Sequence, residues 1–214
     1  MEYAELKRKH KAQQERLPET TNIRLHRALK WLARSEQETD DDDAQFIFLW
    51  IAFNAAYAEE LGHQRSERES LNKFFNKLVT LDSSHRIYQL FFKSFSNQVR
   101  TLIENKFIFE PFWKALREHD SSEEWKKRFE SSKRDALIKL MQNDTPAVLS
   151  IVFDRLYVLR NQLIHGGATW NSEVNRQQVK DGRQLMQLFV PLMIDIMLDA
   201  GNVDFGALTY PVVR

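Results

Sequence analysis

The chain has 214 residues, which is enough to bury a sizeable hydrophobic core. Its charge is almost balanced, with 31 lysines and arginines against 30 aspartates and glutamates, so no overall field favours nucleic acid or a membrane as its partner. It contains no cysteine, which excludes disulfides and thiolate metal sites and is typical of proteins of the reducing cytoplasm.

Helical patterns dominate the chain, and strand patterns are nearly absent. Apolar residues recur at helical spacing, and prolines and glycines interrupt the pattern between segments. The predicted helices span residues 2–16, 21–36, 42–61, 67–79, 83–104, 108–118, 122–142, 146–165 and 172–199. The sequence therefore predicts an all-α fold, with one domain over residues 1–214.

The predicted helix 42–61 is apolar almost all round, which is typical of a helix buried on most sides. Its apolar stretch, 46–58, is too short to span a bilayer, and the N-terminus is polar, so we expect a cytoplasmic protein without membrane contact. Asn54 interrupts this stretch, and its amide needs hydrogen-bond partners. It is interpreted either as a structural hydrogen-bonding residue or as a substrate-binding one.

An arginine occupies an apolar position in the predicted helix 146–165, which Thr145 is expected to cap. Arg160 lies about 40° from Leu156 on a helical projection, inside the stripe that should face the core. A guanidinium keeps its proton, so its burial without a partner is costly. Arg160 should therefore pair with an internal acid such as Asp154 or Asp195, or bind an anion from outside.

The same predicted helix should end at His165, because Gly166 and Gly167 follow it. A glycine just past the last turn adopts the left-handed conformation that ends helices. Asn161 and His165 share a face, whereas Arg160 lies about 140° from His165. The spacing alone therefore does not bring the arginine and the histidine together within one helix.

Arg160, Asn161 and His165 resemble the R-x(4–6)-H motif of the HEPN superfamily, in which a polar residue commonly follows the arginine. The stretches FIFLWIAFNAAYA and LYVLRNQLIHGGATWNSEVNRQQV resemble a bacterial HEPN-like group, and RLHRALKWLAR extends the likeness. The resemblance implies a HEPN-like helical bundle, here with extra N-terminal and inserted helices. Some toxin members carry a tyrosine two residues after the histidine, which an antitoxin modifies; Gly167 occupies that position here.

The resemblance also implies a function, because many HEPN proteins are metal-independent endoribonucleases. Histidine is suited to the proton transfers of RNA cleavage, and arginine to stabilising the charge on phosphorus. The family's solution is a homodimer in which two copies of the motif line one cleft. The resemblance thus predicts RNA as the substrate, Arg160, Asn161 and His165 as catalytic residues, no cofactor, and a toxin or phage-defence role with an antitoxin or defence partner protein.

Other interpretations stay open. Trp170 either stacks on an RNA base or covers the core. The acids 40–43 are better explained as helix caps than as a metal site, and no histidine pair has metal-ligand spacing. The basic stretch 126–134 either follows an RNA backbone or is a solvated helix face. The alternative function is a catalytically inactive HEPN-like module that binds a nucleotide, RNA or protein through Arg160.

Overall fold

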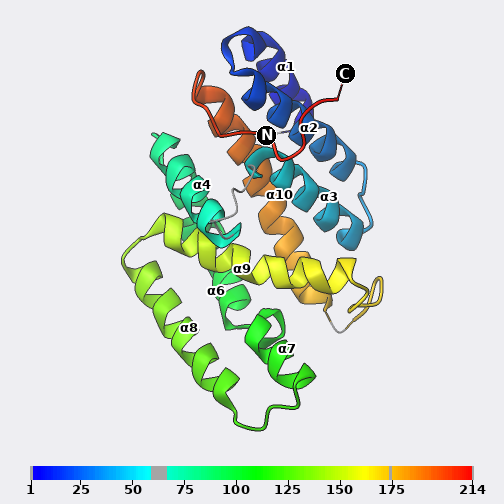
Figure 1. The fold of residues 1–214 in the computed structure, drawn as a ribbon, viewed down its shortest axis with the longest axis vertical. Coiled ribbons are helices and arrows are strands. Elements are labelled where there is room, and N and C mark those ends of the chain that lie inside the picture. The colour runs from blue at the N-terminus through cyan, green and yellow to red at the C-terminus, as the bar shows by residue number, and fades with distance from the viewer. Residues whose placement is uncertain (1, 59–66, 174, 214) are drawn as a thin grey trace. The chain divides into compact units, whose positions relative to one another are not determined.

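A computed structural model of the protein describes residues 2–58, 67–173 and 175–213 (Figure 1). Over these residues the secondary structure is helical and no strand is formed, which confirms the predicted all-α class. The α-helices are α1 (Tyr3–Gln13), α2 (Glu19–Ser35), α3 (Asp42–Tyr57), α4 (Glu67–Leu81), α5 (Arg86–Tyr88), α6 (Ser96–Glu104), α7 (Glu110–Arg117), α8 (Glu124–Met141), α9 (Thr145–Ile164) and α10 (Arg176–Asp199). Shorter elements are the 3-10 helices η1 (Gln14–Arg16) and η3 (Lys106–Ile108) and the π-helix η2 (Gln89–Ser94).

The predicted helices 83–104 and 42–61 differ clearly from the observed ones. Helix 83–104 is divided into α5, η2 and α6, because Phe95 leaves helical geometry at φ −121° and ψ 20°. Helix 42–61 ends earlier than predicted, since Ala58 is extended at ψ 120°, and the remainder of that prediction lies outside the described residues. Among the described helices, none combines the length and apolar character needed to cross a bilayer.

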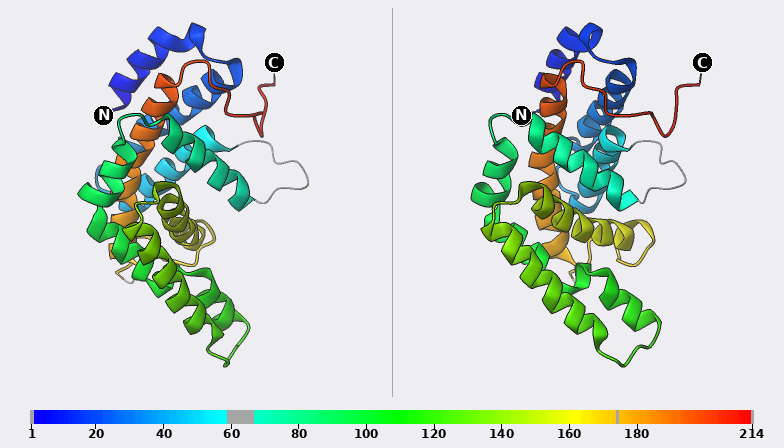
Figure 2. Two further views of the ribbon diagram at one scale, coloured as in Figure 1. Left: turned by 90° about the vertical axis from the view of Figure 1, so that its left-hand side faces the viewer. Right: turned by 60° about the vertical axis from the view of Figure 1, so that its left-hand side comes forward.

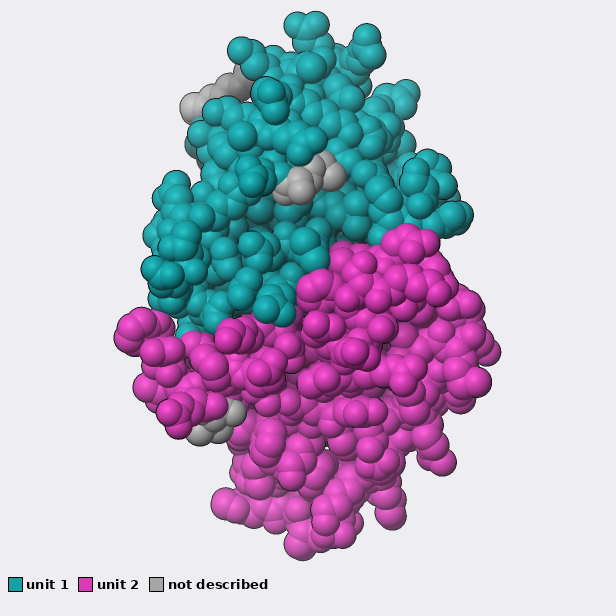
Figure 3. Space-filling view, turned by 180° about the vertical axis from the view of Figure 1, so that it is seen from behind, with its two compact units in different colours: residues 1–87, 183–214 teal, residues 88–182 magenta. Residues whose placement is uncertain are grey.

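The chain divides into two compact units, shown in two colours in Figure 3. Unit 1 consists of Met1–Ile87 and Arg183–Arg214, and unit 2 of Tyr88–Gly182. The division falls inside α10, whose first residues belong to unit 2 and whose remainder belongs to unit 1. That residues 1–214 act as a single domain stays a prediction.

Unit 1 is built around an aromatic cluster contributed by α3, α4 and α10. The ring of Phe53 stacks on Tyr57 at 4.8 Å between centroids and on Phe75 at 6.2 Å, and it packs against Phe189 at 6.4 Å. Phe53, Phe75 and Phe189 are almost completely buried. This explains why α3 is apolar around most of its surface, as the sequence indicated.

The C-terminal tail, residues 201–213, belongs to unit 1 and crosses α2 (Figure 1). Thr21 and Arg24 of α2 donate hydrogen bonds to the tail carbonyls of Val203, Gly206 and Ala207. Phe205 packs on Phe74 of α4, with 6.2 Å between the ring centroids. These contacts hold the tail on the α-helical part of unit 1.

Unit 2 contains a hairpin of α7 and α8, which lie side by side in every view (Figure 2). Phe112 of α7 meets Trp125 of α8 at 4.9 Å, nearly edge to face. Farther along α8, Phe129 packs against Phe109 at 5.2 Å. The buried face of α9 completes this core, with Val152, Leu156 and Leu159 fully buried.

Candidate functional site

The N-cap of the helix that carries the 160–165 motif lies one residue before the predicted cap. The carboxylate of Asp144 accepts a hydrogen bond from the backbone N–H of Ala147 at 3.2 Å, so Asp144, not Thr145, is the N-cap. Pro146 stands in the first turn, where its missing N–H costs no helical hydrogen bond. The length and position of α9 otherwise agree with the prediction.

The helix ends where the glycines predicted. Residue His165 is the C-cap, and Gly166 has φ +69°, the left-handed conformation expected of it. Two backbone hydrogen bonds close the turn, from His165 N to the Asn161 carbonyl at 3.0 Å and from Ala168 N to the Gln162 carbonyl at 3.0 Å. The turn leaves the His165 side chain exposed to solvent.

The guanidinium of Arg160 has a side-chain amide as its hydrogen-bonding partner. Its Nη1 donates to Oδ1 of Asn161 at 2.8 Å, and its Cζ lies 6.0 Å from the centroid of the Tyr157 ring. Over the described part of the chain, Arg160 forms no ion pair with a carboxylate, and its buried Nε has no acceptor. Arg160 is half-buried, so it keeps a cation near the surface without an acidic partner.

The carboxylate of Asp195, one of the expected partners, is engaged within unit 1. It accepts from Lys9 Nζ at 2.6 Å and from Arg86 Nη1 at 2.5 Å. The expectation that an internal acid neutralises Arg160 is therefore not met by the described residues.

The arginine that is deeply buried in unit 2 is Arg155, which the sequence pattern missed. It is 4% exposed, donates to the Ser132 hydroxyl at 3.0 Å, and lies 4.4 Å above the ring of Phe109. Burial lowers the pKa of Arg155 to about 10, although the nearby carboxylate of Asp154 opposes this effect. Arg155 thus stays charged at neutral pH and is stabilised by aromatic faces.

Asn161 is joined to the arginine and not to the imidazole. Its Oδ1 accepts from Arg160, and no hydrogen bond between the Asn161 amide and the His165 ring is present among the described residues. Although Asn161 and His165 share a face of the helix, the described contacts give Asn161 no part in orienting the imidazole within one chain. Its N–H₂ group remains available to a substrate oxygen.

Aromatic groups lie near the end of α9 in unit 2. Trp170 follows the glycine turn and is 70% exposed, so it does not cover the core. Phe107 of η3 is 42% exposed, and Gln162 of α9 donates to its carbonyl at 2.6 Å. Lys106 Nζ lies 5.1 Å from the Phe107 ring. An exposed aromatic ring beside a lysine, as at Phe107, is typical of surfaces on which unpaired bases stack.

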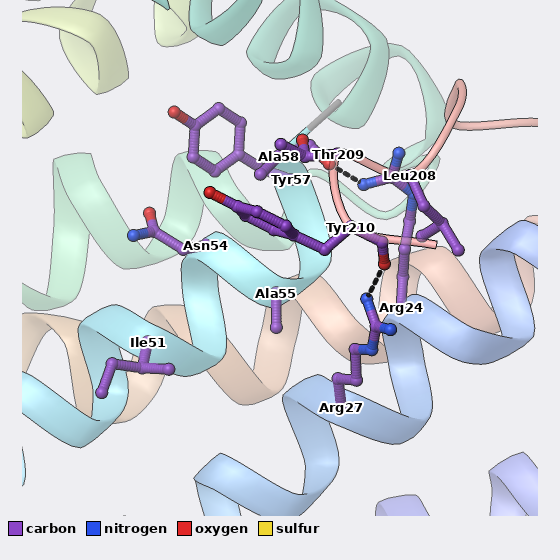
Figure 4. A pocket seen from close by; sticks show the side chains of 10 residues that line it. All are labelled: Arg24, Arg27, Ile51, Asn54, Ala55, Tyr57, Ala58, Leu208, Thr209 and Tyr210. Carbon is purple, nitrogen blue, oxygen red and sulfur yellow. Dashed lines mark hydrogen bonds between the residues drawn. The ribbon is translucent and has the colours of Figure 1, made fainter. Parts of the chain in front are cut away.

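The remaining predicted site residue, Asn54, lies on α3 in unit 1 (Figure 4). Its side chain is half-buried and makes no hydrogen bond within the described residues, so the structural role considered for it is not realised. It lines a cavity of about 450 Å³ together with Arg27, Tyr57 and Tyr210. No sequence pattern indicated this cavity, because the C-terminal tail, which is distant in sequence from α3, supplies one of its walls.

The acidic run 40–43 serves the N-terminus of α3. Asp41 accepts from the backbone N–H of Ala44 at 2.9 Å, and Asp42 forms an ion pair with Arg183 at 2.9 Å. In the described residues, no group of three or more metal-ligating acids and histidines is found. The basic stretch of α8 behaves as a solvated face, with Lys133 paired to Glu130 at 2.7 Å.

No protein-family model matches the chain, and no curated protein or solved structure shows significant similarity to it. The family resemblance therefore depends on the residues of the motif and their surroundings.

Proposed function

We propose that the protein is a HEPN-type endoribonuclease that cleaves RNA without a metal ion and acts as a homodimer. The observation that carries the proposal is the state of Arg160, a cation without a carboxylate partner over the described residues, held by Asn161 at 2.8 Å. A phosphodiester is the natural counter-ion for such a group. The exposed His165 lies at the same helix end and supplies an imidazole, the side chain most often used for proton transfer in catalysis.

The reaction is an in-line displacement at phosphorus. The 2′-hydroxyl loses its proton to a histidine, its oxygen attacks the phosphorus, and the bond to the 5′-oxygen breaks as a second histidine protonates the leaving oxygen. The products are a 2′,3′-cyclic phosphate and a 5′-hydroxyl. Arg160 stabilises the negative charge of the phosphorane through its planar N–H groups.

Two chains are needed because the 160–165 motif contains one imidazole, and base and acid stand on opposite sides of the phosphorus. The helical offset of about 140° between Arg160 and His165 also separates the two groups within one chain. In the proposed dimer, Arg160 of one chain serves a phosphate beside His165 of the other. Trp170 is proposed as a base-stacking residue, and a toxin or phage-defence role with an antitoxin or defence partner is part of the proposal.

The test is cleavage of a mixed RNA pool in the presence of EDTA. We expect the wild type to yield cyclic-phosphate ends, and His165→Ala to lose about 10²- to 10⁴-fold in rate, the usual contribution of general acid–base catalysis. His26→Ala is the matched control, because His26 is an exposed histidine of unit 1. Arg160→Lys retains the charge but loses the planar fork, so it should also be strongly impaired.

Two results would count against the proposal. Intact RNA after incubation of single-stranded and structured substrates with the wild type would favour the inactive binding module instead. Equal cleavage by wild type and His165→Ala would show that the activity belongs to another site or to a contaminant.

A further inference from the structure

Unit 1 contains a second candidate site, which the ribonuclease proposal does not use. It is the cavity of about 450 Å³ between α2, α3 and the C-terminal tail, here called the tail pocket (Figure 4). This volume lies within the range typical of small-molecule sites, about 300–1,000 Å³. Ile51, Ala55, Ala58 and Leu208 provide the apolar lining, and arginine, tyrosine, asparagine and threonine side chains line the rest.

Both charged residues among the described lining are arginines. Arg24 is completely buried and donates to the carbonyls of Ala58, Gly206 and Ala207, which fixes one side of the pocket. Arg27 is half-buried, and its Nη1 donates to the Tyr210 carbonyl at 2.8 Å. The Nε and Nη2 groups of Arg27 donate no hydrogen bond within the described residues. These N–H groups can therefore donate hydrogen bonds to an anion.

Two tyrosine rings and the side chains of Asn54 and Thr209 complete the polar lining. The rings of Tyr57 and Tyr210 reach the pocket from α3 and from the tail, respectively (Figure 4). Tyr210 is 78% exposed, so its ring has a face open to solvent. The Asn54 amide offers one acceptor and two donors that no described residue uses.

Each of these groups recognises one part of a nucleotide. A guanidinium with free N–H groups binds a phosphate, an exposed aromatic ring stacks on a base, and an amide without a partner forms hydrogen bonds with the edge of a base. We propose that the tail pocket binds a free nucleoside monophosphate. The phosphate is bound by Arg27, the base stacks on Tyr210, and the amide of Asn54 bonds the edge of the base. Since the pocket lies wholly in unit 1 and shares no residue with the 160–165 motif, this proposal stands apart from the proposed ribonuclease.

The experiment is isothermal titration calorimetry of the full-length protein with AMP, GMP, CMP and UMP. At least one of them should bind, and the corresponding nucleoside and inorganic phosphate should each bind about 10-fold more weakly or worse, since each lacks part of the recognised chemistry. Arg27→Gln should weaken the best ligand by about 10-fold or more, because a charge-assisted hydrogen bond is lost. Asn54→Ala should weaken it by about 3- to 10-fold.

Lys30→Gln is the matched control. Lys30 is exposed on the same helix and lies outside the pocket, and its substitution removes the same unit of charge. Asn54→Asp provides a second test that does not disturb the tail, because a new carboxylate in the pocket should repel the phosphate. The proposal is overturned if no mononucleotide binds the wild type, or if Arg27→Gln and Lys30→Gln bind equally well.

Discussion

At the scale of single residues, α9 carries two arginines in contrasting environments. Arg155 is 4% exposed, lies 4.4 Å from the ring of Phe109 and is bonded to Ser132. Arg160 is half-buried and bonded to a neutral amide. The charge of Arg155 is stabilised inside unit 2, whereas Arg160 has no carboxylate partner among the described residues. Only the second has the availability that phosphate binding requires.

Gly166 provides the first prediction at this scale. Its φ is +69°, a conformation that a residue with a Cβ atom adopts at a cost of about 1–2 kcal/mol. A Cβ atom added at this position would meet no other atom within 4 Å. Gly166→Ala should therefore lower the free energy of unfolding by about 1 kcal/mol through backbone strain alone. Gly166→Asn should lose less, because asparagine tolerates this conformation. Urea denaturation checks both values, and an alanine variant as stable as the wild type would contradict the strain argument.

The residues at the end of α9 show how far a helical projection can be trusted. The helix end at His165 was predictable, because left-handed glycine is a local requirement of the chain. The degree of burial of Arg160 was not predictable, because a helical projection assumes that one face of the helix is buried. Helix α9 buries a broad surface that includes Arg155 and Val158 beside the expected stripe. The aromatic partners of Arg155 come from residues far away in the sequence, which no periodicity reveals.

At the scale of elements, the π-helix η2 is the main departure from the predicted helices. Leu90 and Phe91 are buried in η2, and Val99, Leu102 and Ile103 are buried in α6. The two elements do not form one α-helix, because η2 is wound more widely than an α-helix and Phe95 leaves helical geometry after it. A continuous helix over 83–104 was a reasonable prediction from the apolar content, which does not reveal where the backbone departs from α-helical geometry.

The second prediction concerns the ion pairs that connect α1, α5 and α10 in unit 1. Asp195 is 5% exposed and bonds Lys9 and Arg86 at 2.6 Å and 2.5 Å. Burial by itself raises the pKa of Asp195, but the hydrogen bonds and charges of Lys9 and Arg86 outweigh it and hold this pKa below its usual value. Asp195→Asn should therefore lose on the order of 2–3 kcal/mol of stability at neutral pH.

The sign of the pH dependence follows from the depressed pKa of Asp195. Its contribution is fully present above the unfolded pKa of about 3.9 and is lost as the pH falls through the folded value. The stability difference between wild type and Asp195→Asn should shrink accordingly in strong acid, as measured by urea denaturation across the pH range. Asp199→Asn is the control, since Asp199 is 52% exposed in the same network and should lose less than about 1 kcal/mol. A pH-independent difference would show that packing, not charge, explains the loss.

At the scale of the whole molecule, the proposed reaction sets a requirement on assembly. Each copy of the 160–165 motif contains one imidazole, that of the exposed His165, and the proposed chemistry uses two. The surface around the motif is suited to a second copy, because Tyr157 and Ile164 of α9 are 40% and 47% exposed on either side of Arg160 along the chain. Large apolar side chains next to an arginine are typical of the central part of protein interfaces.

The last prediction tests this requirement, and it depends on the proposed function. Ile164→Asp should convert a dimer to a monomer in sedimentation analysis and abolish RNA cleavage, because an unpaired carboxylate would be buried at the interface. The helical content should be unchanged, since Ile164 is largely exposed in the single chain. Met141→Asp is the control, because Met141 is 83% exposed at the end of α8 and should leave the dimer intact. A wild type that cleaves RNA as a monomer, or an Ile164→Asp variant that remains an active dimer, would show that two motifs do not need to meet.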